Sequence, residues 1–232
     1  MQGYKHYSFD LWMTLIKSNP LFKIERSQFF FINFNTKKKS LEAVALIFRQ
    51  VDLMCNALNE KTGKNIDSDE MYLMVISMMN DFENHFNKID LVDLNEQMDS
   101  LFFNYMPTVY NDETIICLDQ LKQKSNSTFN ISSNTGFVKG SNLKKVLSHL
   151  KIADYFDFQI YSDEIGISKP DINFFNLMIN KTKNLLVNKN ILLTEIVHIG
   201  DNINADVAGA GLAGIKGLQI NSNNLTISSL LK

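Results

Sequence analysis

The stretch FDLWMTL, residues Phe9–Leu15, continues an apolar run and carries an aspartate, Asp10, at its second position. Residues 4–11 alternate in polarity and then become apolar, which is the pattern of a buried strand. We therefore expect Asp10 at the carboxyl end of a strand, followed by a tight turn that carries Thr14. A carboxylate at such a place can act as a nucleophile, whereas Trp12 has no acidic group that could transfer protons.

The composition is that of a globular chain of 232 residues, with 45% hydrophobic residues and a net charge of −2. This length can bury one core and a smaller lobe. The near-neutral charge argues against nucleic acid as a partner. The short basic run Lys37–Lys39 is typical of a solvated loop or helix start.

Neither membrane nor secretion signals stand out in the sequence. No stretch approaches the roughly 18 consecutive apolar residues that cross a bilayer, and the first ten residues lack the layout of a signal peptide. Cys55 and Cys117 lie far apart, without a CxxC pair or clustered histidines. The sequence therefore predicts a cytoplasmic protein with two unpaired thiols, no membrane partner and no zinc site.

The middle of the chain, from about residue 21 to residue 104, has an almost continuous helical pattern. Apolar residues recur at helical spacing from Leu41 to Met54. A further helix is expected over residues 70–79, with Asp67 or Ser68 as its cap. Such stripes most often form the core of a helical bundle.

Strands and helices alternate after Pro107. The expected strands cover residues 128–132, 158–161, 196–199 and 216–220, and the expected helices cover residues 111–124, 142–150, 173–181 and 206–212. This alternation implies right-handed crossovers and therefore an α/β fold with a mostly parallel sheet. The helical segment is then an insertion after the first strand, with hinges near Ser18–Pro20 and Met106–Thr108.

Ligands of an open parallel sheet bind outside the carboxyl ends of its strands. Chemistry-bearing residues follow or lie near the ends of four expected strands, in the segments Asp10–Thr14, Ser132–Gly136, Ser168–Asp171 and Gly200–Asp206. The topology therefore predicts that carboxylates, a hydroxyl and a lysine meet at one edge of the sheet.

These residue types suit phosphoryl transfer, which needs a nucleophile in line, a cation beside the equatorial oxygens and fixed donors. Asp10 would attack and form an acyl-phosphate, and Asp10 and Asp201 would hold Mg²⁺. Ser133 would donate to a phosphoryl oxygen, and Lys169 would supply positive charge and keep Asp10 ionised. Asp206 would cap the helix that it begins and orient Lys169 or a metal-bound water.

Four motifs together, FDLWMTL (9–15), SSNTG (132–136), ISKPDINFF (167–175) and HIGDNINADVAGA (198–210), resemble those of the haloacid dehalogenase-like (HAD) hydrolase superfamily. The resemblance implies a Rossmann-like α/β core, residues 1–16 and 108–232, with an inserted all-helical cap domain of the first kind, residues 17–107. It also implies a hydrolase that uses Mg²⁺ on a small phosphorylated metabolite while the cap opens and closes. Such a protein is expected to be a monomer or a homodimer.

The remaining site residues are assigned on the same resemblance. Trp12, Thr14 and Asn134 are expected to contact the substrate or its phosphoryl group. The backbone carbonyl of Trp12 would join Asp10 and Asp201 on Mg²⁺, and Asn202 would support the site.

The first motif departs from the pattern of the superfamily's phosphatases, Asp-x-Asp-Gly-Thr. Trp12 replaces the second aspartate, which protonates the leaving group and activates water, and Met13 replaces the glycine. General acid–base help of this kind amounts to roughly 10²–10⁴-fold in rate. The superfamily's haloacid dehalogenases carry an aromatic residue at this position, use no metal and usually lack the acid that corresponds to Asp201.

Three functions therefore stay open. The first is a Mg²⁺-dependent phosphohydrolase for substrates with good leaving groups, because Asp201 beside Asp10 is unfavourable without a cation. The second is a 2-haloacid dehalogenase-type hydrolase with Asp10 as nucleophile. The third is a non-catalytic relative that binds phosphate or a partner, with the apolar run Phe29–Ile32 as a docking surface, although a place in the cap core is the plainer interpretation of that run.

Three further residues have both a functional and a plain interpretation. Arg26 and Arg49, the two arginines of the sequence, could reach a substrate anion from the cap. A solvated helix face is the expectation for both. His198 lies within a strand and is expected to be a hydrogen-bonded histidine of the sheet core.

Overall fold

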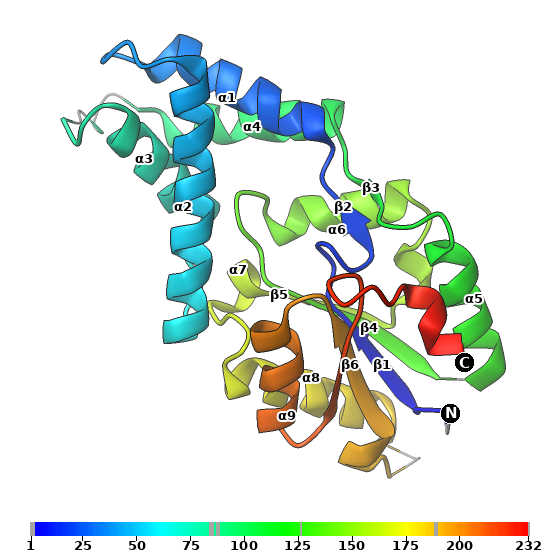
Figure 1. The fold of residues 1–232 in the computed structure, drawn as a ribbon. Helices are drawn as coiled ribbons and strands as arrows, with labels where there is room; N and C mark the ends of the chain where they lie inside the picture. The colour runs from blue at the N-terminus through cyan, green and yellow to red at the C-terminus, as the bar shows by residue number, and fades with distance from the viewer. Residues whose placement is uncertain (1–2, 84–85, 87–88, 126, 188–189, 232) are drawn as a thin grey trace.

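A computed structural model describes residues 3–83, 86, 89–125, 127–187 and 190–231. Its centre is a parallel sheet of five strands in the order β5-β4-β1-β6-β7 (Figure 1). The strands are β1 (His6–Phe9), β4 (Thr128–Ser133), β5 (Phe158–Tyr161), β6 (Ile196–Gly200) and β7 (Lys216–Gln219). The α/β class and the parallel sheet expected from the sequence are thereby confirmed.

Helices cover both faces of this sheet (Figure 1). On one face, α5 (Thr114–Ser125) and α6 (Gly140–His149) pack their apolar sides on Phe9 and Ile131. On the other face, α8 (Ile172–Leu185) and α9 (Gly209–Leu212) pack against Ile160 and Ile196. Shorter helical turns complete the core: α7 (Ser162–Ile165) and the 3₁₀ turns Ala153–Tyr155, Leu193–Glu195 and Ile227–Leu231. The result is a three-layer sandwich whose central strands are buried on both sides.

Side chains of successive strand residues point to opposite faces, so the central strands carry two different rows. Tyr7 and Phe9 on β1 belong to the apolar cluster beneath α5 and α6. Ser8, between them, is in register with Asn130 on β4 and with His198 on β6. A buried polar row therefore runs across the sheet on its second face, directly below the strand ends that carry the site.

The described residues of the inserted part form four helices, above the core in Figure 1. They are α1 (Pro20–Phe34), α2 (Leu41–Thr62), α3 (Ser68–Met79) and α4 (Leu91–Asn104). Their apolar faces bury a separate cluster around Phe30, Phe48 and Tyr72. The ends follow sequence signals: Ser40 and Asp90 cap α2 and α4 with their side chains, and Asp67 forms a capping box with Glu70 at the start of α3.

The two connections between core and helical insertion pair with one another. β2 (Ile16–Lys17) and β3 (Thr108–Val109) form a short antiparallel ribbon, which the sequence pattern did not reveal. The predicted hinges, Ser18–Pro20 and Met106–Thr108, lie at or overlap this ribbon. The division into a core of residues 1–16 and 108–232 and a cap of residues 17–107 remains a proposal, which the ribbon supports.

Cap and core also contact each other away from the ribbon. Phe137, in the loop after β4, packs within the cap cluster, and the hydroxyl of Tyr72 donates to its carbonyl at 3.0 Å. At the far end of α2, the carbonyl of Gly63 accepts from the amide of Ser168 at 2.9 Å, and Ser162 donates its hydroxyl to Asn65 at 2.7 Å. The cap is thus seated on the loops that follow β4 and β5.

The last predicted helix begins earlier than expected. We expected it over residues 206–212 with Asp206 at its start, and this expectation is wrong. A π-helix covers Ile203–Ala208 and runs into α9, and its cap is Asn202, whose side chain accepts from the amides of Asn204 and Ala205. The side chain of Asp206 is thereby left for other partners.

Two expectations about thiols and membranes can be compared with the described residues. Cys55 and Cys117 are both buried and unpaired, as expected. None of the described helices combines the length and the apolar character that are needed to cross a membrane.

Candidate active site

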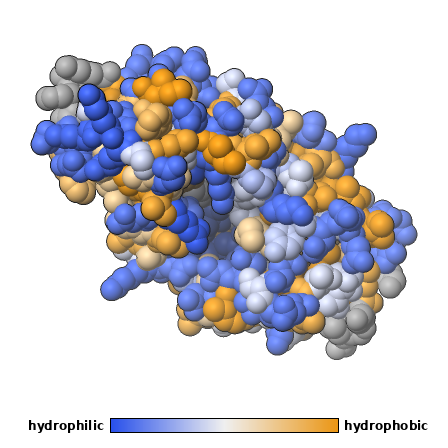
Figure 2. All heavy atoms as spheres, turned by 45° about the horizontal axis from the view of Figure 1, so that its top comes forward, coloured by the Kyte–Doolittle hydropathy of each residue, from blue (hydrophilic) through white to orange (hydrophobic). Residues whose placement is uncertain are grey.

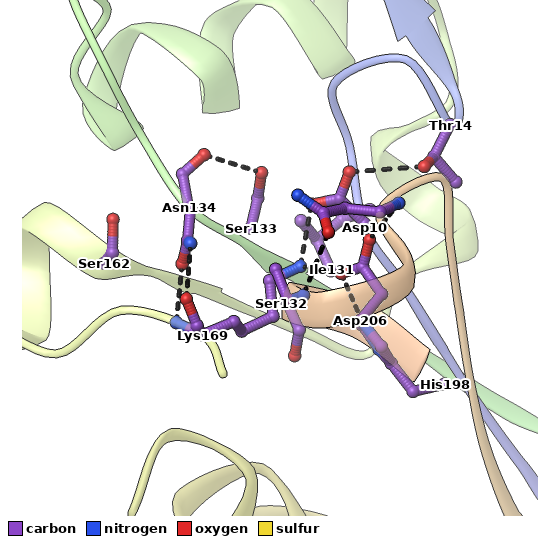
Figure 3. Close-up of polar contacts among 12 residues, drawn as sticks. Asp10, Thr14, Ile131, Ser132, Ser133, Asn134, Ser162, Lys169, His198 and Asp206 are labelled. Atoms are coloured by element: carbon purple, nitrogen blue, oxygen red, sulfur yellow. Dashed lines mark hydrogen bonds and ion pairs between the residues drawn. The ribbon is translucent and has the colours of Figure 1, made fainter. Parts of the chain in front are cut away.

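The site lies where β1, β4 and β6 end (Figure 3). Residues of the cap, such as Arg26, line the same cavity as Asp10. Asp10 directly follows β1, and its amide donates to the carbonyl of Ile199 on β6 at 2.8 Å. Only 6% of Asp10 is exposed. The hydroxyl of Thr14 donates to Oδ2 of Asp10 at 3.2 Å, so the carboxylate is held from the turn as well as from the strand.

Lys169 lies between two carboxylates (Figure 3). Its Nζ is 2.8 Å from Oδ1 of Asp10 and 2.6 Å from Oδ1 of Asp206, and the residue is 1% exposed. Asn134 fixes the backbone of Lys169 from both sides, because its Nδ2 donates to the carbonyl at 2.9 Å and its Oδ1 accepts from the amide at 2.8 Å. The ammonium group is therefore placed by residues from three different strand ends.

Asp206 receives hydrogen bonds on both oxygens. Oδ1 accepts from Lys169 and faces Nε2 of His198 at 3.0 Å, and Oδ2 accepts from the amide of Asn202 at 3.0 Å. Gly200 makes room for this carboxylate, because a Cβ added to it would lie 2.1 Å from Asp206. Asp206 thus contacts Lys169 directly, and the role of orienting Lys169 stays a prediction.

Burial and crowding shift the ionisation of these groups. Burial raises the pKa of Asp10 to about 7, with Asp206 and Asp201 adding to the effect and Lys169 opposing it. Burial and then Asp206 raise the pKa of Asp201 to about 6. Burial alone would raise the pKa of Asp206, but Lys169 and then His198 outweigh it, so that pKa is lowered. Burial alone would lower the pKa of Lys169, but Asp10 and then Asp206 outweigh it, so that pKa is raised.

Three carboxylates gather at this edge. Oxygen atoms of Asp10, Asp201 and Asp206 all lie within 4.8 Å of one another. Lys169 compensates one of the three charges, and hard carboxylate oxygens are the ligands that Mg²⁺ prefers. The donor set therefore fits a divalent cation. Asp10 and Asp201 are the pair of carboxylates whose negative charge Lys169 does not fully balance.

Two of the predicted phosphate contacts lie deeper than the others. Thr14 and Ser133 are both 0% exposed. Ser133 donates its hydroxyl to the carbonyl of Asn134 at 3.1 Å. Thr14 and Ser133 do not line the cavity between cap and core, whereas Asn134 does. In this arrangement Thr14 orients Asp10 and Asn134 orients Lys169, while contact with a substrate remains a prediction for both.

A cavity of about 540 Å³ opens between cap and core, and Figure 2 shows the surface hollowed there. Asp10, Lys169 and Asp201 lie on its core side. Trp12 and Phe137 give it an apolar wall. The volume suits a small metabolite.

The turn after Asp10 carries strain at Met13. Its φ is +58°, a left-handed conformation that costs a residue with a Cβ roughly 1–2 kcal/mol. The side chain of Asn221 donates to the carbonyls of Met13 and Thr14 at 2.7 and 3.1 Å. The turn after Asp10 therefore forms although Met13 stands where the phosphatase motif has glycine.

The expectation for Arg26 is wrong. Arg26 is buried, with 7% exposure, and its guanidinium carbon lies 4.2 Å from the ring centre of Phe48 and 4.3 Å from that of Phe137. Its Nε is buried without a hydrogen-bond partner, and the residue lines the cavity. Arg49 is exposed and pairs with Asp52 at 3.7 Å, as a solvated helix face requires.

The sequence did not reveal the surroundings of two buried residues near the site, His198 and Arg26. His198 was expected to be a plain core histidine, and it is buried and hydrogen-bonded, but one of its bonds goes to Asp206. The signal was its position two residues before Gly200 on the same strand face. For Arg26 the sequence signal of burial was the neighbouring aromatic run, because Phe30, one helical turn further along, lies in the cap core. The run Phe29–Ile32 is thus partly core, while Ile32 itself is 68% exposed.

The comparison with protein families and solved structures agrees with this geometry. The family model of haloacid dehalogenase-like hydrolases matches residues 7–220. No curated protein sequence matches.

Three solved structures share the fold at low identity. The HAD-hydrolase YfnB from Bacillus subtilis bound to magnesium is 16% identical, with a TM-score of 0.72 over 97% of this chain and 92% of that one. A 2-haloacid dehalogenase from Pseudomonas syringae pv. Tomato DC3000 is 19% identical, with a TM-score of 0.62 over 95% and 88%. A HAD phosphatase from Thermococcus onnurineus is 20% identical, with a TM-score of 0.61 over 95% and 87%. By its sequence from β1 to the end of β7 and by its fold, the chain belongs to the haloacid dehalogenase-like hydrolases.

Proposed function

We propose that the protein is a Mg²⁺-dependent phosphohydrolase that acts on a small phosphorylated metabolite through an aspartyl-phosphate on Asp10. The observation that carries the proposal is the group of three carboxylates, Asp10, Asp201 and Asp206, with one lysine among them. Buried like charges at this spacing are unfavourable unless a cation joins them. Halide displacement creates no multiply charged anion, so a site for that reaction does not need Asp201 as an additional carboxylate.

Asp10, Asp201 and the backbone carbonyl of Trp12 are the residues that would hold the cation, which when bound would neutralise charge on the phosphoryl oxygens. Lys169 contributes fixed positive charge beside Asp10, and at 1% exposure its charge acts with little solvent screening. Asp206 and Asn134 keep Lys169 in place. The hydroxyl of Ser133 already donates to the carbonyl of Asn134, so it would have to exchange that bond for one to a phosphoryl oxygen. Backbone amides of the loop after β4, which lines the cavity, are the other candidate donors.

The chemistry proceeds in two displacements. An oxygen of Asp10 attacks phosphorus while the bond from phosphorus to the leaving oxygen breaks, which produces an aspartyl-phosphate and releases the leaving group as an anion, such as a phenolate or a carboxylate. Water then attacks phosphorus, the bond to Asp10 breaks, and orthophosphate leaves. Trp12 supplies no proton in either step, so we infer substrates whose leaving group is stable as an anion, such as aryl or acyl phosphates.

The test is a phosphatase assay with an aryl phosphate, with and without Mg²⁺. The proposal requires turnover that disappears with EDTA and in Asp10→Asn. Asp154→Asn, a change to an exposed carboxylate outside the site, is the matched control and should leave turnover unchanged. Absence of Mg²⁺-dependent turnover for aryl and acyl phosphates alike would refute the proposal.

A 2-haloacid dehalogenase is the second candidate, and two observations favour it. Trp12 gives the cavity an apolar wall and no proton shuttle, and Arg26 presents a buried guanidinium whose Nε lacks a partner. Such a group is suited to a carboxylate. Release of chloride or bromide from a 2-haloacid that persists in EDTA would establish this function instead.

A relative without catalytic activity is the third reading. It would bind Mg²⁺ and phosphate but show neither phosphate nor halide release. Calorimetric binding of Mg²⁺ and orthophosphate together with both negative assays would identify it.

We infer a cytoplasmic setting for all three candidate functions, from the buried unpaired thiols.

A further inference from the structure

His198 lies below the site, in the buried polar row of the sheet. It is 0% exposed, and both ring nitrogens have partners: Nδ1 is 2.9 Å from the hydroxyl of Ser8, and Nε2 is 3.0 Å from Oδ1 of Asp206. Figure 3 shows the imidazole on the opposite side of Asp206 from Asp10. His198 therefore touches the carboxylate that holds Lys169.

The partners of His198 define its tautomer. Asp206 is held ionised by its ion pair, and an ionised carboxylate can only accept hydrogen bonds. Nε2 must therefore carry the hydrogen, and Nδ1 accepts from the hydroxyl of Ser8. Burial and the nearby Lys169 keep the imidazole neutral by lowering the pKa of His198.

The surroundings leave the imidazole little freedom. The ring of Phe175 packs edge-on against it, with ring centres 5.2 Å apart and an angle of 83° between the planes. Gly200, two residues further on the same face of β6, opens the space that Asp206 fills. The strand pairing places Ser8 directly opposite His198.

We propose that His198 is a positioning residue for the reaction at Asp10. Its Nε2–H holds Oδ1 of Asp206, and that same oxygen holds the ammonium of Lys169 2.8 Å from Asp10. Without the imidazole donor, Asp206 keeps only the amide of Asn202 and Lys169 itself as partners, so Lys169 is anchored less firmly on the side opposite Asp10. The kinetic part of this inference rests on the proposed phosphohydrolase function.

The chain offers a matched control in His6. This histidine is also 0% exposed, lies on the same face of β1, and has both ring nitrogens bonded, at 2.8 Å to Thr128 and at 2.8 Å to Asn130. Among the described residues, the hydrogen-bond partners of its ring are Thr128 and Asn130, not Asp206 or Lys169. A loss that reflects only a damaged polar row should follow from His6→Leu and from His198→Leu alike.

The kinetic experiment compares His198→Leu, His198→Gln and His6→Leu on an aryl phosphate. We expect His198→Leu to lower kcat by about 10–100-fold, the range for partners that orient catalytic groups, with KM nearly unchanged. His198→Gln keeps an N–H for Asp206 and should stay within about threefold of the wild-type kcat. Equal losses in all three variants, or no loss in His198→Leu, would overturn the proposal.

A second arm tests the route through Asp206. In an Asp206→Ala background the further change His198→Leu should have little additional effect on kcat or on stability, because the acceptor of the imidazole N–H is already absent. Additive losses would refute coupling through Asp206.

A third arm is independent of any activity. The ¹⁵N shifts of the His198 imidazole in the wild-type protein should show a neutral ring protonated at Nε2, and Asp206→Asn should change them. A ring protonated at Nδ1 would overturn the inference. If no phosphatase activity is found, the proposed function fails, while the ¹⁵N shifts and the stability coupling still decide the geometry assigned to His198.

Discussion

Replacing Asp201 by asparagine is expected to stabilise the protein when no divalent cation is present. Burial and the neighbouring Asp206 raise the pKa of Asp201 to about 6, from an ordinary value of 3.8. A difference of about 2 in pKa corresponds to about 3 kcal/mol of unfavourable free energy for the ionised form. Because the residue is partly exposed, solvent screening reduces this by about half, to roughly 1–2 kcal/mol.

The sign follows from proton linkage. The folded state binds the Asp201 proton more tightly than the unfolded state does, so this group's contribution to stability is fully present below about pH 4 and is lost as the pH rises through about 6. Asp201→Asn removes the charge, and its advantage over the wild type should therefore be absent near pH 4 and complete above pH 7.

Magnesium should reverse the order of the two proteins. A cation that binds only the folded state stabilises it by about 2.7 kcal/mol at 100 times its Kd. The wild type should gain this stabilisation, and Asp201→Asn, which lacks one of the proposed ligands, should gain little.

The assay is urea denaturation at pH 5 and pH 8, in EDTA and in saturating Mg²⁺. Asp154→Asn is the control for removing a carboxylate outside the site. A variant less stable than the wild type at pH 8 in EDTA, or equal stabilisation of both by Mg²⁺, would contradict the reasoning about charge crowding at this edge.

Three further outcomes are expected. Trp12→Asp should raise kcat on an alkyl phosphate by at least about tenfold, because it supplies a general acid and base; no gain, with Mg²⁺ still bound in calorimetry, would show that the cavity serves other chemistry. Burial lowers the pKa of His6 to about 4, so urea unfolding should show up to about 3 kcal/mol of stability lost between pH 6.5 and pH 4, and His6→Gln should remove this component; parallel pH profiles would count against it. Gly63→Ala should lower the melting temperature, since φ is +71° and the new Cβ would lie 2.2 Å from Oδ2 of Asp171; Gly211→Ala, with open space around it, is the control, and equal melting temperatures would contradict the prediction.

The sequence by itself determined the layers and the edge at which the site lies. The strands of the core show the apolar and alternating patterns of buried strands, and their alternation with helices leaves a parallel sheet as the solution. In a parallel sheet every strand ends at the same edge, so Asp10, Lys169 and Asp201 had to meet there. These conclusions needed only local periodicity and connection rules.

Only the tertiary structure decided which partner each buried group has. Asp206 was predicted to cap a helix and to orient Lys169 or a metal-bound water. The fold uses Asn202 as the cap and places Asp206 against Lys169 and also against His198, a partner that the sequence did not predict. Arg26 looked like a surface residue of a helix, and the packing of Phe137 from the core encloses it. A residue's own neighbours in sequence fix its helix or strand and the face on which it lies. Its burial and its hydrogen bonds also depend on other segments, such as Lys169, which lies 37 residues from Asp206 and 159 residues from Asp10, and no local pattern records their approach.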